Sequence, residues 1–269
     1  MLAVLLLAEA LAAPATTRPH SATTGKESAP LPATERLTYR VEWNPPRYLF
    51  LLPPMEVGEA TLSLVGETRY NDKKALKIVF TARSSGTLVR LFGIKIDDYF
   101  EFTTDPETFC TYCVTKKIRE GRRMRDIDLV YHPESRQLHM REVDVSTLVP
   151  RVLRDKDYEE IPPCVRDLFS ALYSFRRTDL TAGTSRRVLV GNDEHIKEVE
   201  VRVKKSERVA TPAGDFMAWR VDTVAIFGGL FKSGGQFRMW LSADDRKIPV
   251  KFEAKASIGK VVGSLREAR

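Results

Sequence analysis

The sequence predicts an all-β, mainly antiparallel protein, built as a curved sheet or an open or partial β-barrel with one capping α-helix. Three observations predict this class. Apolar residues recur at every second position over most of the chain, turn-forming clusters separate these runs, and one central stretch changes to helical spacing. Strands joined by short turns pair antiparallel, because parallel pairing needs a crossover of a dozen or more residues.

The first 34 residues precede this pattern. Residues 1–13 (MLAVLLLAEALAA) are apolar and end in the small-residue pattern Ala10-Leu11-Ala12, which predicts a signal peptide and export. No Lys or Arg precedes the run and Glu9 interrupts it, so a disordered apolar tail is the alternative. Residues 14–34 are rich in Pro, Ala, Ser and Thr and predict a disordered linker. Residues 35–269 are expected to form a single β-rich domain.

Alternation marks the strands of this domain. It is clear in Leu37, Tyr39, Val41 and Trp43, and returns at residues 61–65, 77–82, 97–103, 126–131, 198–204 and 250–258. Turn signals such as residues 105–107 (DPE), 132–135 (HPES) and 211–215 (TPAGD) lie between the runs. About a dozen strands follow from this pattern. Each is half-buried, so the sheet is expected to have one solvated side.

The central stretch, residues 161–180 (IPPCVRDLFSALYSFRRTDL), predicts the helix. Its apolar stripe is Val165, Leu168, Leu172 and Phe175, which predicts an amphipathic helix over about residues 165–177. Asp167 in the first turn and basic residues at the end suit the helix dipole. We expect this helix to bury its stripe against the open mouth or edge of the curved sheet.

Composition is that of a globular protein, with 43% hydrophobic and 29% charged residues and a net charge of +7. The basic clusters are Lys116, Lys117, Arg119, Arg122, Arg123 and Arg125, then Arg186 and Arg187, then Lys204 and Lys205. They are either solvated strand faces or a surface for an anionic partner, which in an exported protein is a lipid or an anionic membrane surface. No pattern indicates nucleic-acid binding. No later segment approaches the ~18 apolar residues of a membrane-spanning helix, so a soluble periplasmic or cell-envelope protein is expected after signal cleavage.

Four stretches carry a family resemblance. They are LTYRVEW with VGEATLSL (37–43 and 57–64), DLFSALYSFRRTDLTAG (167–183), VATPAGDFMAWRV (209–221) and MWLSADDRKIPVKFEAKASIGKVVGSL (239–265). In this order and spacing the chain resembles the bacterial family known as domain of unknown function 3108, whose members are typically exported. The insert RYLFLLPPM (47–55) and the three cysteines depart from the family pattern. The resemblance implies a curved antiparallel sheet with a helix in the cell envelope, and implies no activity.

The three cysteines are Cys110, Cys113 and Cys164. Three ligands are too few for a structural zinc site, and residues three apart on a strand point to opposite faces. In an oxidising compartment one disulfide is expected from Cys164 to Cys110 or Cys113, with Cys113 preferred. The alternative is three unpaired buried thiols.

Catalytic and cofactor motifs are not found in the sequence. There is no Gly-x-Ser-x-Gly elbow, no His-Glu-x-x-His and no phosphate-binding Gly-x-x-x-x-Gly-Lys loop, and the chain has four His. Asp126 and Asp128 share one face of a strand, but a solvated face is a better interpretation than a metal site. We therefore expect no cofactor, no metal and no enzymatic activity.

Three connections break the alternation with bulky apolar residues. The residues expected to face a ligand or a membrane are Leu49, Phe50, Leu51, Leu88, Arg90, Leu91, Phe92, Leu230, Phe231 and Lys232. Exposed loop tips of this kind would form a docking patch, whereas segments folded inward would cover an end of the sheet.

The predicted function is therefore a non-catalytic envelope protein that binds or handles a lipid or another amphipathic molecule in a barrel-like cavity. One alternative is a structural or assembly factor that docks an envelope partner protein, and a second is an envelope enzyme acting on glycan or lipid. An apolar cavity favours the first, a filled interior the second, and a polar cleft with paired carboxylates the third.

Overall fold

A computed structural model of the chain describes residues 30–46, 52–86, 93, 95–193, 195–224, 237–256 and 259–269. Within these residues, fourteen strands form one sheet. The strands are β1(Glu35–Asn44), β2(Met55–Tyr70), β3(Lys73–Ser84), β4(Asp97–Thr104), β5(Thr111–Glu120), β6(Arg123–His132), β7(Gln137–Asp144), β8(Arg151–Tyr158), β9(Ser185–Asn192), β10(His195–Thr211), β11(Gly214–Val224), β12(Phe237–Ser242), β13(Pro249–Ala256) and β14(Gly259–Ala268). The helix of the described chain is α2(Leu168–Arg176).

The sheet consists of two antiparallel meanders that meet in its centre. Strands β1 to β8 follow one another outward, β14 to β9 follow one another in the other direction, and β1 pairs with β14. The first and last strands are therefore neighbours, and the free edges are β8 and β9. Helix α2 lies between these two strands in the sequence, so the connection that contains it crosses from one edge of the sheet to the other.

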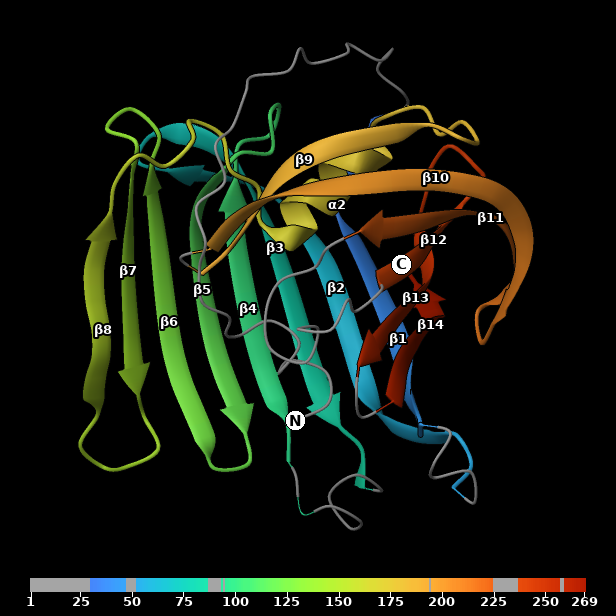
Figure 1. Cartoon of the computed structure of the whole chain (residues 1–269), viewed down its shortest axis with the longest axis horizontal. Helices are drawn as coiled ribbons and strands as arrows, with labels where there is room; N and C mark the ends of the chain where they lie inside the picture. Colours follow the sequence, from blue (N-terminus) through green and yellow to red (C-terminus); the bar gives the residue numbers. More distant parts are fainter. Residues whose placement is uncertain are drawn as a thin grey trace.

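Register shifts bend the sheet into a curve. They interrupt the pairing at Leu64/Gly66 in β2, at Val203/Ser206 in β10 and at Trp240/Leu241 in β12, among other places. Such bulges bend a strand and increase its twist. Figure 1 shows the result: β9 and β10 pass over helix α2, which lies above the inner face of β3 and β4. The prediction of a curved, open antiparallel sheet with one capping helix is confirmed.

Alternation places one side of most strands in the core, whereas the edge strand β8 has no buried residue. In β1 the buried residues are Leu37, Tyr39, Val41 and Trp43, as predicted. The same parity makes Glu35 face inward, where it is 7% exposed. A buried carboxylate requires a charged or hydrogen-bonding partner, and this partner comes from the helix.

The segment before the helix joins the two halves of the sheet. Its Val165 carbonyl accepts a hydrogen bond from the Thr111 N–H of β5 at 2.8 Å, and Arg166 forms a parallel bridge with Val190 of β9. The Gly191 N–H donates to the Arg166 carbonyl at 2.8 Å. A Cβ at Gly191 would lie 2.7 Å from the Val165 side chain, so only glycine permits this close approach.

A buried ion pair connects the same two halves. Lys116 of β5 points inward and donates to Asp193 at 2.7 Å and to Asn192 at 3.0 Å, at the end of β9. The side chains of Lys116 and Asp193 are 8% and 12% exposed. The sequence pattern placed Lys116 in a basic cluster that was either a solvated strand face or a surface for an anionic partner. Both interpretations are wrong for Lys116, because its strand parity turns it toward the interior.

Candidate functional site

Helix α2 begins at an aspartate whose carboxylate is saturated with hydrogen bonds. Asp167 is the N-cap and accepts from the N–H groups of Phe169 and Ser170 at 2.8 and 2.9 Å, and from the Ser170 hydroxyl. The Thr111 hydroxyl donates to Asp167 at 3.0 Å and accepts the Asp167 N–H at 2.8 Å. Burial raises the pKa of Asp167, and the hydrogen bonds from Ser170 oppose that rise.

This cap makes the helix shorter than the predicted residues 165–177. The carboxylate of Asp167 satisfies the first free N–H groups, so helical geometry starts at Leu168 and ends at Arg176. Val165, predicted to lie in the helical stripe, is buried in the extended segment before the cap. Phe169 packs against Phe80 of β3 and Phe102 of β4, with ring centroids 4.8 and 5.3 Å apart.

The other end of the helix is anchored by a buried ion pair. The Arg176 guanidinium donates to both oxygens of Glu35, at 2.6 and 2.8 Å, and to the Arg246 carbonyl at 2.9 Å. The Tyr173 hydroxyl donates to Glu35 at 3.1 Å. Burial by itself would lower the pKa of Arg176, but the hydrogen bonds and charge of Glu35 outweigh burial and raise it. The helix is thus held at both ends.

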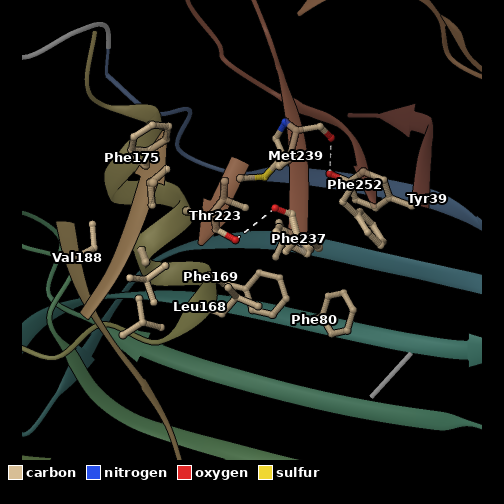
Figure 2. Close-up of a pocket in the computed structure, with 17 residues that line it drawn as sticks. Tyr39, Phe80, Leu168, Phe169, Phe175, Val188, Thr223, Phe237, Met239 and Phe252 are labelled. Carbon is tan, nitrogen blue, oxygen red and sulfur yellow. Dashed lines mark hydrogen bonds between the residues drawn. The ribbon is translucent and has the colours of Figure 1, made fainter. Parts of the chain in front are cut away.

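Between the helix and the curved sheet lies an apolar cavity of about 110 Å³. Figure 2 shows the helix on one side and strands of both meanders around it. The lining residues are Tyr39, Leu62 and Phe80 from β1 to β3; Leu168, Phe169, Ala171, Leu172 and Phe175 from α2; Val188, Val190, Val199 and Val201 from β9 and β10; and Thr223, Phe237, Met239, Pro249 and Phe252 from β11 to β13. The cavity is therefore built from residues that are up to 213 positions apart in the sequence, at Tyr39 and Phe252.

The two hydroxyl groups in this lining already have partners. The Tyr39 hydroxyl donates to the Pro249 carbonyl at 2.7 Å, and the Thr223 hydroxyl donates to the Phe237 carbonyl at 3.3 Å (Figure 2). Burial raises the pKa of Tyr39 well above its ordinary value, so this hydroxyl stays protonated. The lining thus offers apolar surface to a guest and directs its hydroxyl groups toward the protein backbone.

The cavity lies where separately packed parts of the core meet. Tyr39 and Leu62 belong to the main core, Phe175 packs with Val221 and Leu241 in a second cluster, and Val190 packs with Val199 in a third. Interiors are normally filled to crystal-like density. A gap at the meeting point of three clusters is therefore a structural feature that a ligand group can fill.

The disulfide differs from the predicted pairing. Cys164, at the start of the segment before the helix, is bonded to Cys110 and not to Cys113. Cys110 precedes β5 in the loop at its start, whereas Cys113 lies on the strand, is half-buried and is a free thiol. The expected function of the bridge is retained, because it still fastens the helix segment to the sheet. The alternative of three unpaired thiols is wrong.

The predicted ligand-facing residues lie outside the described structure. These are Leu49, Phe50, Leu51, Leu88, Arg90, Leu91, Phe92, Leu230, Phe231 and Lys232. The described cavity instead uses strand and helix residues. In the sequence, the cavity-lining residues Thr223 and Phe237 stand on either side of residues 225–236, which contain Leu230 and Phe231.

Three aspartates on the sheet differ in their surroundings: Asp126 and Asp128 have partners on the neighbouring strand, whereas Asp98 is buried. Asp126 pairs with Arg119 at 2.6 Å and Asp128 accepts from the Thr115 hydroxyl at 2.8 Å, so both aspartates have partners on the neighbouring strand. Asp98 is 1% exposed, and burial raises its pKa to about 7 even though the Arg119 N–H donates to it at 2.7 Å. The charge of Glu120 acts in the same direction as burial.

The fold and the site define a class: an open, curved antiparallel sheet whose single described helix encloses an apolar cavity. The chain belongs to the family described as protein of unknown function (DUF3108), whose model matches residues 38–266. A search of functionally curated proteins finds no match. Within the described residues no helix has the length and apolar character to cross a bilayer.

Solved structures of similar fold include a β-barrel-like protein of domain of unknown function DUF1849 from Brucella abortus. It has a TM-score of 0.53 and 9% sequence identity, over 90% of this chain and 99% of that chain. This likeness shows a shared fold. Weaker similarities are to a protein described as exported and of YmcC-like fold from Bacteroides fragilis, with 10% identity, a TM-score of 0.38 and coverage of 90% and 99%, and to one described as a lipoprotein from Parabacteroides distasonis, with 9% identity, a TM-score of 0.36 and coverage of 92% and 100%.

Proposed function

We propose that this protein is a non-catalytic component of the bacterial cell envelope that binds the apolar part of a lipid or another amphipathic molecule in the cavity beneath helix α2. The observation that carries the proposal is the lining. Its side chains are apolar or aromatic except for Thr223, and the hydroxyls of Thr223 and Tyr39 donate to backbone carbonyls. A polar guest would lose its hydration without gaining partners.

The volume limits which part of a ligand enters. An apolar cavity of about 150 Å³ accommodates a guest of the size of benzene, whereas pockets for whole drug-sized ligands measure about 300–1,000 Å³. At about 110 Å³ the cavity matches a single ring or a short stretch of hydrocarbon chain. We therefore propose that it holds one hydrocarbon segment while the rest of the molecule stays outside.

An oxidising compartment is part of the proposal. The Cys110–Cys164 disulfide supports it, because such bonds persist in secreted and periplasmic proteins and are rare in the cytosol. The apolar residues 1–13 support export in the same way. A lipid or lipid-linked molecule of the envelope is accordingly the expected ligand class.

Native mass spectrometry of protein purified from the envelope fraction tests this function, together with titration of a fluorescent fatty-acid probe. Ala171→Leu places a larger side chain in the cavity and is expected to weaken probe binding at least tenfold. Ser174→Leu is the matched control, because Ser174 lies on the same helix but does not line the cavity. If no lipid is recovered and both variants bind the probe like the wild type, the proposal is wrong and a partner-docking role becomes the better explanation.

A further inference from the structure

Two neighbouring hairpins end side by side at one end of the sheet. They are the β5–β6 turn with residues 121–124 and the β7–β8 connection with residues 145–152, which together we call the tip surface. The Val145 N–H donates to the Met124 carbonyl at 3.1 Å, which holds the two tips together. Figure 1 shows both turns at the lower end of the green and olive strands, away from helix α2.

The tip surface exposes large apolar side chains. Leu148 and Val149 are 103% and 79% exposed, and Val152 and the adjacent Leu153 are 49% and 40% exposed. Among the described residues, seven large hydrophobic side chains are exposed, and four of them are these. Scattered single residues of this kind are ordinary, but four within six consecutive positions at one end of a hairpin indicate an interaction surface.

Every charged residue in the same two segments is an arginine. These are Arg122, Arg123 and Arg151, and no Asp or Glu occurs in residues 121–124 or 145–152. The carboxylates lie one residue behind the tips, at Glu120 and Asp144. An apolar tip that carries three arginines matches the interface of an anionic bilayer, where apolar side chains enter the acyl boundary and guanidinium groups reach the phosphates.

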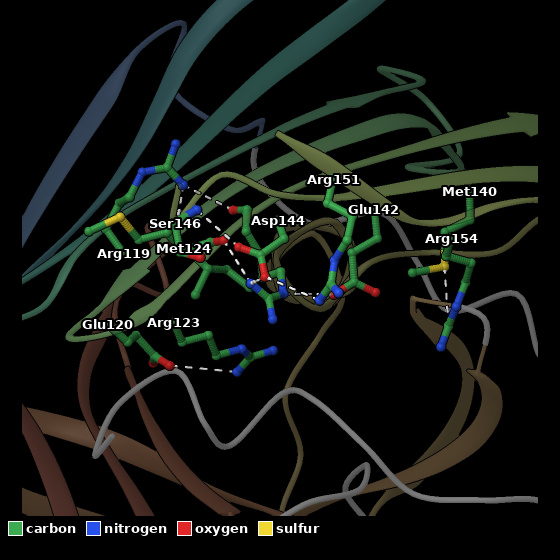
Figure 3. Close-up of polar contacts among 12 residues, drawn as sticks. Arg119, Glu120, Arg123, Met124, Met140, Glu142, Asp144, Ser146, Arg151 and Arg154 are labelled. Carbon is green, nitrogen blue, oxygen red and sulfur yellow. Dashed lines mark hydrogen bonds and ion pairs between the residues drawn. The ribbon is translucent and has the colours of Figure 1, made fainter. Parts of the chain in front are cut away.

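The two carboxylates behind the tip, Asp144 and Glu120, form ion pairs with nearby arginines. Asp144 accepts from Arg125 at 2.8 Å and from the Ser146 N–H at 2.9 Å, while Arg151 lies 3.9 Å away with its side chain 74% exposed. Arg123 lies 3.6 Å from Glu120. Figure 3 shows these contacts gathered at one end of the strands. Because Asp144 is engaged mainly by Arg125, the Arg151 guanidinium is available to an external anion.

We propose that the tip surface docks this protein onto an anionic phospholipid membrane, with Leu148 and Val149 inserted and with Arg122, Arg123 and Arg151 at the level of the lipid phosphates. A protein partner is less well matched. A stable protein interface needs about 1,000 Å² or more of complementary surface, whereas the exposed apolar side chains here all lie within residues 148–153. The docking surface is separate from the cavity, so this inference does not depend on the proposed ligand.

Vesicle flotation with the full chain tests the proposal, comparing vesicles of phosphatidylcholine with vesicles that also contain phosphatidylglycerol. The wild type is expected to float with the anionic vesicles and to detach as salt is raised. Leu148→Ser/Val149→Ser should weaken binding at least tenfold. Arg122→Gln/Arg151→Gln should weaken it about twenty-fivefold at low salt, since one basic residue near an anionic surface contributes about fivefold.

Matched controls carry the same substitutions at exposed sites elsewhere. Val65→Ser/Met217→Ser removes two apolar side chains that are 51% and 55% exposed. Arg187→Gln/Arg208→Gln removes two guanidinium groups from side chains that are 62% and 75% exposed. All variants carry the same N-terminal residues, so any binding by that segment cancels. Ala171→Leu, which tests the cavity, should float like the wild type.

Two results would overturn the proposal. One is unchanged flotation of both tip variants, or an equal loss in the controls. The other is self-association of the wild type without vesicles that the Leu148→Ser/Val149→Ser variant abolishes, because the tip would then be an interface between copies of the chain.

Discussion

Arg176 and Glu35 form a bidentate ion pair that joins the end of helix α2 to the first residue of β1, 141 positions earlier in the chain. Both side chains are buried, at 0% and 6% exposure. The pair fixes the helix over the hollow of the sheet, because Arg176 also donates to the Arg246 carbonyl in the loop between β12 and β13. The cavity beneath the helix depends on this anchor and on the Asp167 cap.

Loss of one partner in this pair should destabilise the protein strongly. Arg176→Met leaves the Glu35 carboxylate buried without its counter-charge, and the expected cost is about 3–5 kcal/mol in the free energy of unfolding. Urea denaturation measures it. Arg208→Met is the control, because the Arg208–Asp215 pair is exposed and is expected to contribute less than about 1 kcal/mol. Equal effects of the two substitutions would contradict the structural role of Arg176.

The disulfide should stabilise the chain while the free thiol should not. Cys164→Ser or Cys110→Ser removes the bond between two residues that are 54 positions apart in the sequence. The chain-entropy model gives a loss of about 4 kcal/mol in the free energy of unfolding. Cys113→Ser is expected to change stability by less than about 1 kcal/mol. Thermal unfolding of the three variants with and without a reductant checks this. If Cys113→Ser behaved like Cys164→Ser, the pairing would be wrong.

The two halves of the sheet should separate more easily without Lys116. Lys116→Met removes the buried ammonium that bonds Asp193 and Asn192, and we expect a loss of about 3 kcal/mol. Lys117→Met is the control on the adjacent, exposed position, with an expected change within about 0.5 kcal/mol. The rate of hydrogen exchange at the β9 amides should rise in Lys116→Met only. Wild-type protection of the β9 amides in Lys116→Met would show that Lys116 does not hold β9 against β5.

Asp98 should make stability depend on pH. Its folded-state pKa of about 7 lies above the ordinary value of 3.8, so the folded state retains a proton that the unfolded state has lost. The resulting stabilisation is complete below pH ~4, decreases as the pH rises and is gone above pH ~7, with an upper limit on the order of 4 kcal/mol. The asparagine side chain in Asp98→Asn does not titrate, so this variant does not lose stability as the wild type does. The stability of Asp98→Asn relative to the wild type should therefore increase from pH 4 to pH 8.

Chemical denaturation at several pH values measures this difference. Asp97→Asn, which removes a carboxylate at the exposed neighbouring position where Asp97 pairs with Arg83 at 2.9 Å, is the control. A constant difference between Asp98→Asn and the wild type across this range would show that Asp98 does not titrate there.

Much of the fold follows from local pattern. The period-two runs located seven of the fourteen strands, namely β1, β2, β3, β4, β6, β10 and β13, and the change of period at residues 165–175 located the helix. Both signals are local, because side-chain direction in a strand or helix depends on residues a few positions apart. The same parity could have identified Glu35 and Lys116 as inward-facing. It could not identify their partners, since Arg176 and Asp193 lie 141 and 77 positions away.

The choice between Cys110 and Cys113 shows the same limit. Both positions are close to the start of β5, and only the path of residues 161–167 along Thr111 places Cys164 beside Cys110. The cavity was predicted only as a general hollow, because its lining combines side chains from eight strands and the helix. No local pattern encodes how closely such distant side chains pack.

The sequence by itself determined many of the strands and turns, their antiparallel pairing and the central helix, because each depends on interactions between residues near one another in the chain. Tertiary structure alone decided that β1 pairs with β14, that β8 and β9 are the edges, and that three core clusters leave a cavity under the helix. These features depend on contacts between distant segments. Their energies come from burial, ion pairing and close packing, which exist only once the chain has folded.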